Sequence, residues 1–443
     1  MIFRHLNEYN QPPIRDYTER QMFLRFHDRF ATACGIALQG LEQTPFTVDL
    51  LPYEKPSFFS KWKSSFRKKQ TPAAWGFDFG YSCVKAVRVT FDDEGVLAVD
   101  QCFNCHHPYD GPPLDDNADL AKLTDQQIAD VLQKQEQKSP FAHDEGRTVQ
   151  LRVDQHQFQL LALELFLTKY VYQGEKICVA YPSHNLLCAN ITLPQMTPQQ
   201  TWQAVQYEAK HLMPDNPNLF QSGYLVLGWE EDEENVMKQY IHLFSTRIGT
   251  TETLLALLQK YGISPNLMTT SILANLNYAH LLSTLPPVLQ PPFPEKETEQ
   301  PIQQSPDNGE SDIPELQSIL ICDMGTQGTD VTFYNLREIK HHYISIGGQE
   351  FTKSIVKTTG ETFHMAEAIK RNPTKRTSDL SKIVNAVKPV ALRLVNEILL
   401  RLQPVRQSGI PLDRVVVLGG GFQLNGFANH FKSLLNAKWE ITK

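Results

Sequence analysis

Two stretches that lie far apart in this chain share one design, and this repeat constrains the fold more than any other feature. Each stretch has an apolar run, an Asp-x-Gly sequence, a short polar turn and a second run in which apolar residues alternate. The aspartates are Asp78 and Asp323, and a polar residue stands seven positions after each, Lys85 and Asp330 respectively. Alternation around a glycine-containing turn is typical of a β-hairpin. The sequence therefore predicts two similar hairpins, one in each half of the molecule.

Paired hairpins of this kind suit the phosphate tail of a nucleotide. A glycine lets the backbone approach phosphate oxygens, and the N–H groups of a turn form an anion-binding nest. An aspartate repels phosphate, so Asp78 and Asp323 are expected to hold a hydrated Mg²⁺ or to orient an attacking water, as metal-binding and catalytic residues. The residues expected to hold the phosphates are Gly80, Ser82, Lys85, Gly325, Thr326 and Thr329.

A glycine triplet near the other end of the chain is the third element of the predicted site. The apolar run 415–418 leads into Gly419, Gly420 and Gly421, and a helix is expected near Asn425. Backbone without side chains at the mouth of a sheet gives a flat purine room, and a helix terminus adds its dipole. The spacing is not the G-x-G-x-x-G of a dinucleotide-binding fold. We expect the triplet to contact the nucleoside.

The order of these three elements resembles the superfamily of actin, Hsp70 and the sugar kinases, and its details resemble the PilM and FtsA branch. The resemblance covers about residues 72 to 440. The segments that match the pattern of this branch are 80–87, 193–196, 207–214, 345–352 and 366–370. The resemblance implies an actin-like α/β fold of two RNase H-like domains around a nucleotide cleft, with an inserted α/β subdomain.

The resemblance also implies ligands and further site residues. ATP and Mg²⁺ are the implied ligands, Gly347 and Gly348 would lie at the site, and Glu367 and Lys370 would contact the ribose or base. Two positions depart from the pattern of the branch. Gly328 stands where a second threonine is usual, and Tyr81 is bulkier than the usual residue of the first turn. Weak ATP hydrolysis stays open on this basis.

Proteins of this branch hold a short hydrophobic N-terminal peptide of the membrane-anchored partner PilN. The resemblance therefore implies an ATP-binding adaptor of the type IV pilus inner-membrane platform, at the cytoplasmic face of the inner membrane. An extended peptide in such a groove needs apolar pockets for alternate side chains, which the inserted subdomain is expected to supply. Two alternatives stay open: a nucleotide-free scaffold of a type II secretion system, and a small-molecule kinase of the same fold. Self-association is also open.

The chain divides into six expected regions. A helix around residues 197–213 is the clearest local prediction, because Thr197 and Gln200 can form a capping box. No chemistry is assigned to the first 57 residues, where a short helix is expected around 21–38. The regions are an N-terminal extension (1–71), the first actin-like domain (72–194), the inserted subdomain (195–265), a return to the first domain (266–285), a Pro-rich linker (286–314) and the second actin-like domain (315–443).

The segment 58–70 combines aromatic residues at helical spacing with a basic face and has no acidic residue. Such a segment suits an anionic lipid surface, and a solvated linker explains it equally well. Elsewhere the chain has no run of eighteen apolar residues, and its seven scattered cysteines are typical of reduced thiols. The net charge of -7 gives no pull toward nucleic acid. We expect a cytoplasmic protein, peripheral to the membrane.

Overall fold

The computed structural model describes most of the chain, and the gaps fall between its elements. The described residues are 23, 27–51, 72–91, 95, 97–106, 155–170, 174–181, 186–212, 216–282, 318–371, 379–423 and 427–440. The basic segment 58–70 and the Pro-rich linker 286–314 lie outside them, so the predictions made for these two segments stay predictions. No helix in the described ranges is long and apolar enough to cross a membrane.

The first half is built on a five-stranded sheet with the order β3-β2-β1-β4-β8. The predicted first hairpin is confirmed: β1 and β2 are antiparallel, and β1 also pairs with β4 in parallel. The strands are β1 (Ala73–Phe79), β2 (Cys83–Phe91), β3 (Leu97–His106), β4 (Lys176–Tyr181) and β8 (Leu267–Thr270). The helices are α2 (Ala31–Gly40), α5 (Gln155–Lys169), α7 (Ile248–Gln259) and α8 (Ser271–Leu281), preceded by the short 3-10 helix η2 (His27–Arg29).

Helices cover both faces of this sheet, as the burial of β1 requires. Trp75 and Phe77 of β1 pack with α5 and α7 on one face, whereas Ala74 packs with α2 and α8 on the other. Successive residues of a strand point to opposite faces, so a strand covered on both sides is apolar throughout. Five consecutive residues of β1, from Ala73 to Phe77, are accordingly buried.

The second half repeats this design on a four-stranded sheet with the order β11-β10-β9-β12. The second predicted hairpin is confirmed, since β9 and β10 are antiparallel and β9 pairs with β12 in parallel. The strands are β9 (Ile319–Met324), β10 (Thr329–Tyr334), β11 (Ile339–Ile344) and β12 (Arg414–Leu418). The helices are α9 (Gly348–Thr359), α10 (Phe363–Arg371), α12 (Leu380–Arg401), α13 (Gln403–Gln407), η6 (Gly420–Gln423) and α14 (Phe427–Glu440).

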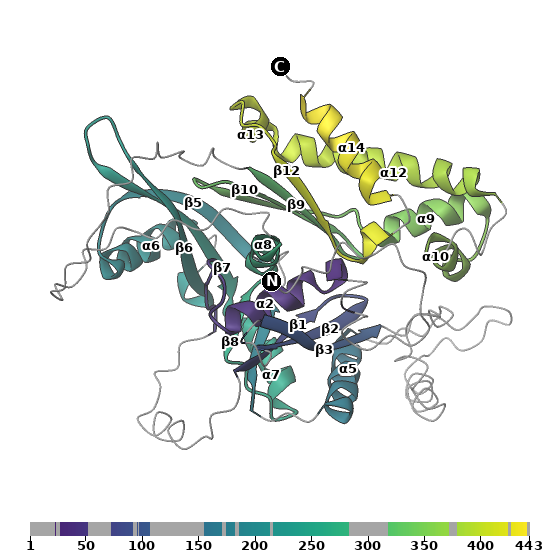
Figure 1. The fold of residues 1–443 in the computed structure, drawn as a ribbon, viewed down its shortest axis with the longest axis horizontal. Coiled ribbons are helices and arrows are strands. Elements are labelled where there is room, and N and C mark those ends of the chain that lie inside the picture. The colour runs from purple at the N-terminus through teal and green to yellow at the C-terminus, as the bar shows by residue number, and fades with distance from the viewer. Residues whose placement is uncertain are drawn as a thin grey trace.

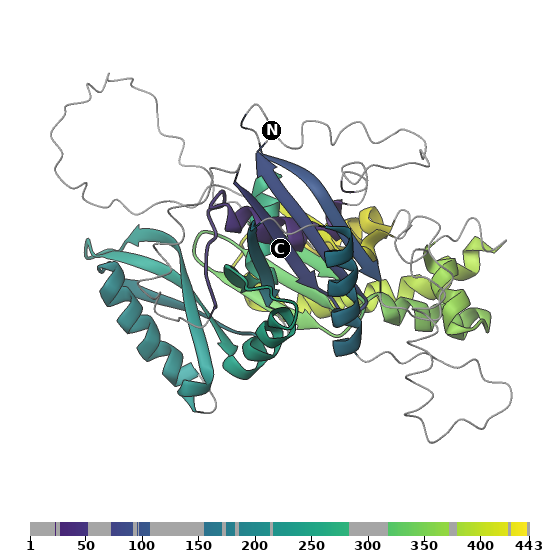
Figure 2. The same ribbon diagram turned by 90° about the horizontal axis from the view of Figure 1, so that it is seen from below.

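A three-stranded sheet with one helix forms the inserted subdomain (Figure 2), in the order β5-β7-β6. Its elements are β5 (Leu186–Pro194), α6 (Pro198–Leu212), η5 (Pro217–Leu219), β6 (Phe220–Glu231) and β7 (Met237–Arg247). The predicted capping box at α6 is present, because Thr197 and Gln200 exchange hydrogen bonds. The sheet begins before the expected boundary at residue 195, and α7 packs with the first half, because Leu257 and Leu258 complete that core.

Helix α2 lies between the two halves (Figure 1), although no chemistry was expected of its region. It covers Ala31–Gly40, and all ten of its residues are buried. Residues 21, 22 and 24–26 of the helix expected around 21–38 lie outside the described residues. Its core also contains Ile319, Ile321 and Leu418 of the second half, and Phe46 meets Tyr334 edge to face at 5.3 Å. One apolar core therefore spans both halves, and the N-terminal segment 27–50 belongs to it.

Small residues let α2 approach its neighbours closely. A Cβ atom on Gly35 would lie 1.9 Å from the carbonyl oxygen of Ala274 in α8. A Cβ atom on Gly76 of β1 would lie 2.0 Å from the carbonyl oxygen of Ala33 in α2. Both contacts are with backbone, which cannot swing away as a side chain can. Glycine at these two positions thus fixes the position of α2 against the sheet.

Gly35→Ala should lower the free energy of unfolding by about 3 kcal/mol or more, at the upper end of overpacking costs. The control is Gly249→Ala, because a Cβ atom there has nothing within 4 Å. Urea unfolding of the three proteins measures the difference. Equal stability of the two variants would contradict this packing of α2.

Buried histidines lie where the inserted subdomain meets the second half. Nδ1 of His242 in β7 lies 2.7 Å from Oδ1 of Asn190 in β5, and Asn190 bonds the backbone of Ile339 in both directions. Burial lowers the pKa of both His242 and His341 to about 3. A neighbouring histidine lowers each pKa further, His341 that of His242 and His342 that of His341. Both are therefore neutral at pH 7.

The free energy of unfolding should consequently decrease as the pH is lowered past about 6.5. Between about 6.5 and 3 the unfolded chain protonates these histidines and the folded chain does not, so unfolding is favoured by up to about 1.4 kcal/mol per pH unit for each. Urea midpoints at pH 7.5 and 5.0 measure the loss, and His242→Gln should reduce it. The exposed His211, changed to Gln, is the control and should leave the pH dependence unaltered.

Candidate functional site

The polar pair of the first hairpin forms the start of the candidate site. Asp78 and Lys85 face each other in the register of β1 and β2, as do Asp323 and Asp330 in β9 and β10. Lys85 Nζ lies 2.6 Å from Asp78 Oδ2, and both side chains are mostly buried. Burial alone would lower the pKa of Lys85, but Asp78, Cys83 and Asp323 together raise it. Lys85 is therefore a fixed positive charge.

The two hairpins meet directly. The hydroxyl groups of Ser82 and Thr326, one from each turn, share a hydrogen bond across the two halves. Asp323 is close enough to Lys85 and Asp78 for charge interactions with both: burial raises the pKa of Asp323, Asp78 raises it further and Lys85 opposes them. The structure thus brings Asp78, Lys85 and Asp323 together at one place.

Asp323 is held by two residues that the sequence did not single out. Asn275 Nδ2 of α8 donates to Asp323 Oδ2 at 3.0 Å, and the hydroxyl of Thr32 in α2 lies 3.5 Å from the same oxygen. Thr32 also donates to Asn275 Oδ1 at 2.9 Å. These three polar groups satisfy one another in an otherwise apolar core. An Asn within an apolar helix is the one signal that could have indicated Asn275.

The glycine triplet borders the same aspartate. Gly419 has φ of +85°, and a Cβ atom there would lie 2.4 Å from Asp323 Oδ1. A Cβ atom on Gly421 would lie 2.4 Å from Met324 Sδ. Side chains are therefore excluded for both conformational and steric reasons at Gly419. Gly420 begins the 3-10 helix η6, and α14 follows close to the expected position.

The second turn is joined to the N-terminus of α9. The amide of Gly348 donates to the carbonyl of Gly325, and the amide of Gln349 donates to the carbonyl of Thr326, both at 2.9 Å. A Cβ atom on Gly347 would lie 2.5 Å from the amide nitrogen of Gly328. Gly347 and Gly348 are thus placed beside the turn, and the helix amides are bonded to turn carbonyls.

Two threonine positions of this hairpin have structural explanations. The hydroxyl of Thr329 is buried and donates to the carbonyl of Ile346 at 2.7 Å, so in this structure it is used within the second half. A Cβ atom on Gly328 would lie 2.4 Å from the ring of Tyr343. The backbone carbonyl of Ile344, 2.7 Å from such a Cβ atom, and the ring of Tyr343 together explain why this chain has glycine where a second threonine is usual.

Glu367 and Lys370 form a buried ion pair on α10. Lys370 Nζ lies 2.6 Å from Glu367 Oε2 and donates at 2.9 Å to both Thr352 Oγ1 and the carbonyl of Gly348. Burial opposes ionisation of Glu367, but Lys370 and Arg371 lower its pKa to about 2. Burial lowers the pKa of Lys370. Through Gly348 this pair adjoins the second turn, and it ties α10 to α9.

The N-terminal segment supplies further contacts that sequence reasoning missed. Lys85 Nζ donates to the carbonyl of Arg29 at 2.9 Å, and the amide of Gly419 donates to the carbonyl of Asp28 at 3.0 Å. The only sequence signal was the run of small residues in 31–40, which is typical of a closely packed helix but not of a ligand site.

The donor set suits a nucleotide carrying a hydrated cation. Lys85, the turn amides and hydroxyls can bind phosphate oxygens, while two carboxylates can bind the water shell of Mg²⁺. Within the described ranges no group of three or more His, Cys, Asp or Glu side chains could hold a metal directly.

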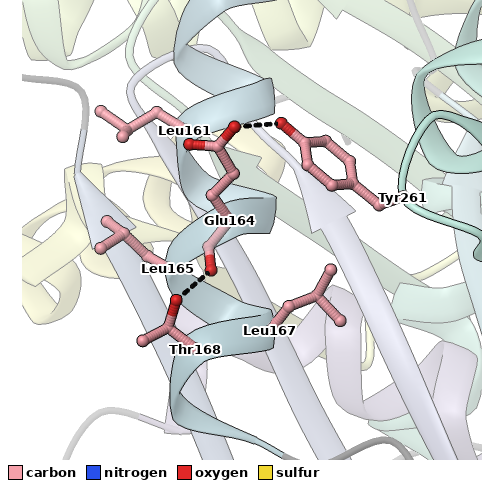
Figure 3. A pocket seen from close by; sticks show the side chains of 6 residues that line it. All are labelled: Leu161, Glu164, Leu165, Leu167, Thr168 and Tyr261. Atoms are coloured by element: carbon pink, nitrogen blue, oxygen red, sulfur yellow. Dashed lines mark hydrogen bonds between the residues drawn. The ribbon is translucent and has the colours of Figure 1, made fainter.

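A shallow hollow on the outer surface of α5, of about 370 Å³, has no connection with these residues. Tyr261 donates to Glu164 at 2.7 Å there, and the other lining residues are shown in Figure 3. It lies on the face of the first sheet opposite α2, so it adds nothing to the site.

The fold is the mixed α/β fold of the actin-like proteins, as the sequence predicted. The solved structure of a PilM-PilN type IV pilus biogenesis complex is similar, with a TM-score of 0.54 and 17% identity over 82% of this chain and 85% of that chain. The structure of the ethanolamine utilization protein EutJ from Carboxydothermus hydrogenoformans has a TM-score of 0.39 and 14% identity, over 83% of this chain and 84% of that chain. That of an archaeal actin homolog in complex with ADP has a TM-score of 0.33 and 14% identity, over 82% of this chain and 91% of that chain. No family model and no curated protein matches the chain.

Proposed function

We propose that this chain is an ATP-binding adaptor of a type IV pilus inner-membrane platform, which couples a PilN-like membrane-anchored partner to cytoplasmic machinery. The observation that carries the proposal is the meeting of the two Asp-x-Gly hairpins around Lys85. Similarity of fold to the PilM of a PilM-PilN complex supports the choice among actin-like proteins.

The roles proposed for the site residues follow from their chemistry. Lys85 and the turn residues would bind phosphate, and Asp78 and Asp323 would hold hydrated Mg²⁺, which when bound neutralises phosphate charge. The glycines of the triplet and the Glu367–Lys370 pair would adjoin the nucleoside. Asn275 would orient Asp323, since it donates to one carboxylate oxygen and leaves Oδ1 beside Gly419.

The inserted subdomain is the proposed binding surface for the partner peptide. Among the described residues, half of the twelve large apolar side chains that are exposed belong to it. They are Leu187, Trp202, Tyr207, Leu212, Leu219 and Val236. Exposed apolar groups gathered on one subdomain are typical of a protein-binding surface. An extended hydrophobic peptide would contact the exposed apolar side chains of α6, Tyr207 among them.

A second candidate function, a nucleotide-free scaffold, is favoured by one observation. The core around α2 joins both halves through buried apolar side chains, so the halves are held together without any ligand. Large apolar contacts between domains restrict their relative motion. A scaffold of this kind would bind partners with the same surfaces and would need no nucleotide cycle.

Mg-ATP titration by calorimetry tests the nucleotide proposal. The wild type should bind, and Asp323→Asn should bind at least tenfold more weakly, because the cation then loses a charged partner near the phosphates. The control is Glu397→Gln, which removes a half-exposed carboxylate from α12 in the same half. Equal binding by all three proteins would remove Asp323 from the site. No heat from any of them would favour the scaffold.

Peptide binding tests the proposed partner surface. A synthetic peptide of the cytoplasmic N-terminus of a PilN-like single-span membrane protein should bind, and Tyr207→Ala should weaken binding several-fold, because Tyr207 is 63% exposed and aromatic side chains dominate such surfaces. Leu400→Ala is the control, since Leu400 is equally exposed on the second half. Fluorescence anisotropy of the labelled peptide gives the affinities, and an equal loss in both variants would contradict the assignment.

A further inference from the structure

We infer that the segment His27–Thr32 is an intrachain ligand of the candidate site, whose backbone carbonyls take the place of nucleotide oxygens. The inference rests on the proposed function in that it concerns the same site. Lys85 and Gly419 are two donors expected to face a nucleotide, and each already donates to this segment, at 2.9 Å to Arg29 and 3.0 Å to Asp28. A carbonyl oxygen is a hydrogen-bond acceptor of partial negative charge, so it satisfies Lys85 as a phosphate oxygen would and the Gly419 amide as a nucleoside oxygen would.

The segment is anchored on both sides of these carbonyls. Helix α2 follows it and is wholly buried, with Gly35 in contact with the backbone of α8. Phe30 is 1% exposed, and its ring lies 6.1 Å from that of Phe23. His27 Nδ1 lies 2.8 Å from the hydroxyl of Tyr278 in α8. The position of the carbonyls is therefore set by the core of the first half.

The same contacts join the two halves. Lys85 belongs to β2 of the first half, whereas Gly419 follows β12 of the second half, and the segment bonds to both. Thr32 continues the bridge, because its hydroxyl lies between Asn275 of α8 and Asp323 of β9. In an actin-like fold a nucleotide between the halves would make such a bridge. Here the chain makes it for itself.

A nucleotide would accordingly compete with the segment. Its observed affinity equals its intrinsic affinity multiplied by the fraction of molecules in which the segment is displaced, so a small fraction means weak binding. Displacement needs residues 27–30 to move and Phe30 to leave the core, while α2 stays in the core and continues to hold the halves together. Partner binding that loosened this segment would raise the affinity for nucleotide.

Hydrogen exchange tests the segment without nucleotide. In the full chain the amide of Gly419 should be protected, and Phe30→Ala should speed its exchange at least tenfold by releasing the segment. The amide of Gly348, which donates to Gly325 within the second half, should be unchanged. Fast exchange of Gly419 in the wild type, or no response to Phe30→Ala, would overturn the inference.

Mg-ATP titration then tests the competition. Phe30→Ala should bind at least tenfold more tightly than wild type, whereas Phe158→Ala, which makes the same truncation in the core around α5, should not. Weaker binding by Phe30→Ala would mean that the segment forms part of the nucleotide site, and the competition would be wrong. If neither protein binds ATP while the Gly419 amide responds, the segment stands as the ligand of the cleft and the nucleotide proposal fails.

A measurement on the unaltered chain covers the case in which Phe30→Ala does not fold. Saturating Mg-ATP should speed trypsin cleavage of the bond between Arg29 and Phe30, followed by mass spectrometry, because displacement exposes it. Cleavage after Lys438, whose carbonyl accepts from Arg406 far from the cleft, is the control. Slower cleavage after Arg29 with ATP would overturn the competition.

Discussion

The close packing of α2 between the two halves is the contact on which the rest of the structure depends. Gly35 lets the backbones of α2 and α8 touch, and Gly76 lets β1 touch α2, so α2 packs tightly against the first half. The same core draws in Ile319, Ile321 and Leu418 of the second half. The relative position of the hairpins, and hence of Asp78 and Asp323, follows from this packing.

The polar groups at the edge of that core are consistent with both proposed functions. Lys85 is paired with Asp78, and Asp323 accepts a hydrogen bond from Asn275. These contacts form without a ligand, as a scaffold requires. It also offers donors and carboxylates that a nucleotide with Mg²⁺ could use once the carbonyls of Asp28 and Arg29 withdraw.

The structure favours movement of a short segment over movement of one half against the other. A shared apolar core resists the opening of one half against the other, because separation would expose buried surface at a cost of about 25 cal/mol per Å². Movement of residues 27–30 alone exposes far less.

Local pattern by itself determined the two hairpins, the capped helix α6 and the glycine turn after β12, because each depends on neighbours within a few residues. It also indicated the residues that gather at the cleft, since the repeat marks the same position in both sheets. Only the tertiary structure decided that residues 27–50 belong to the core, that Asn275 and Thr32 lie against Asp323, and that the Ile344 backbone and the Tyr343 ring leave room only for glycine at 328. These depend on contacts between residues that are distant in the chain. The sequence alone does not show that Ala33 or Gly35, unlike other small residues, contacts the backbone of another element.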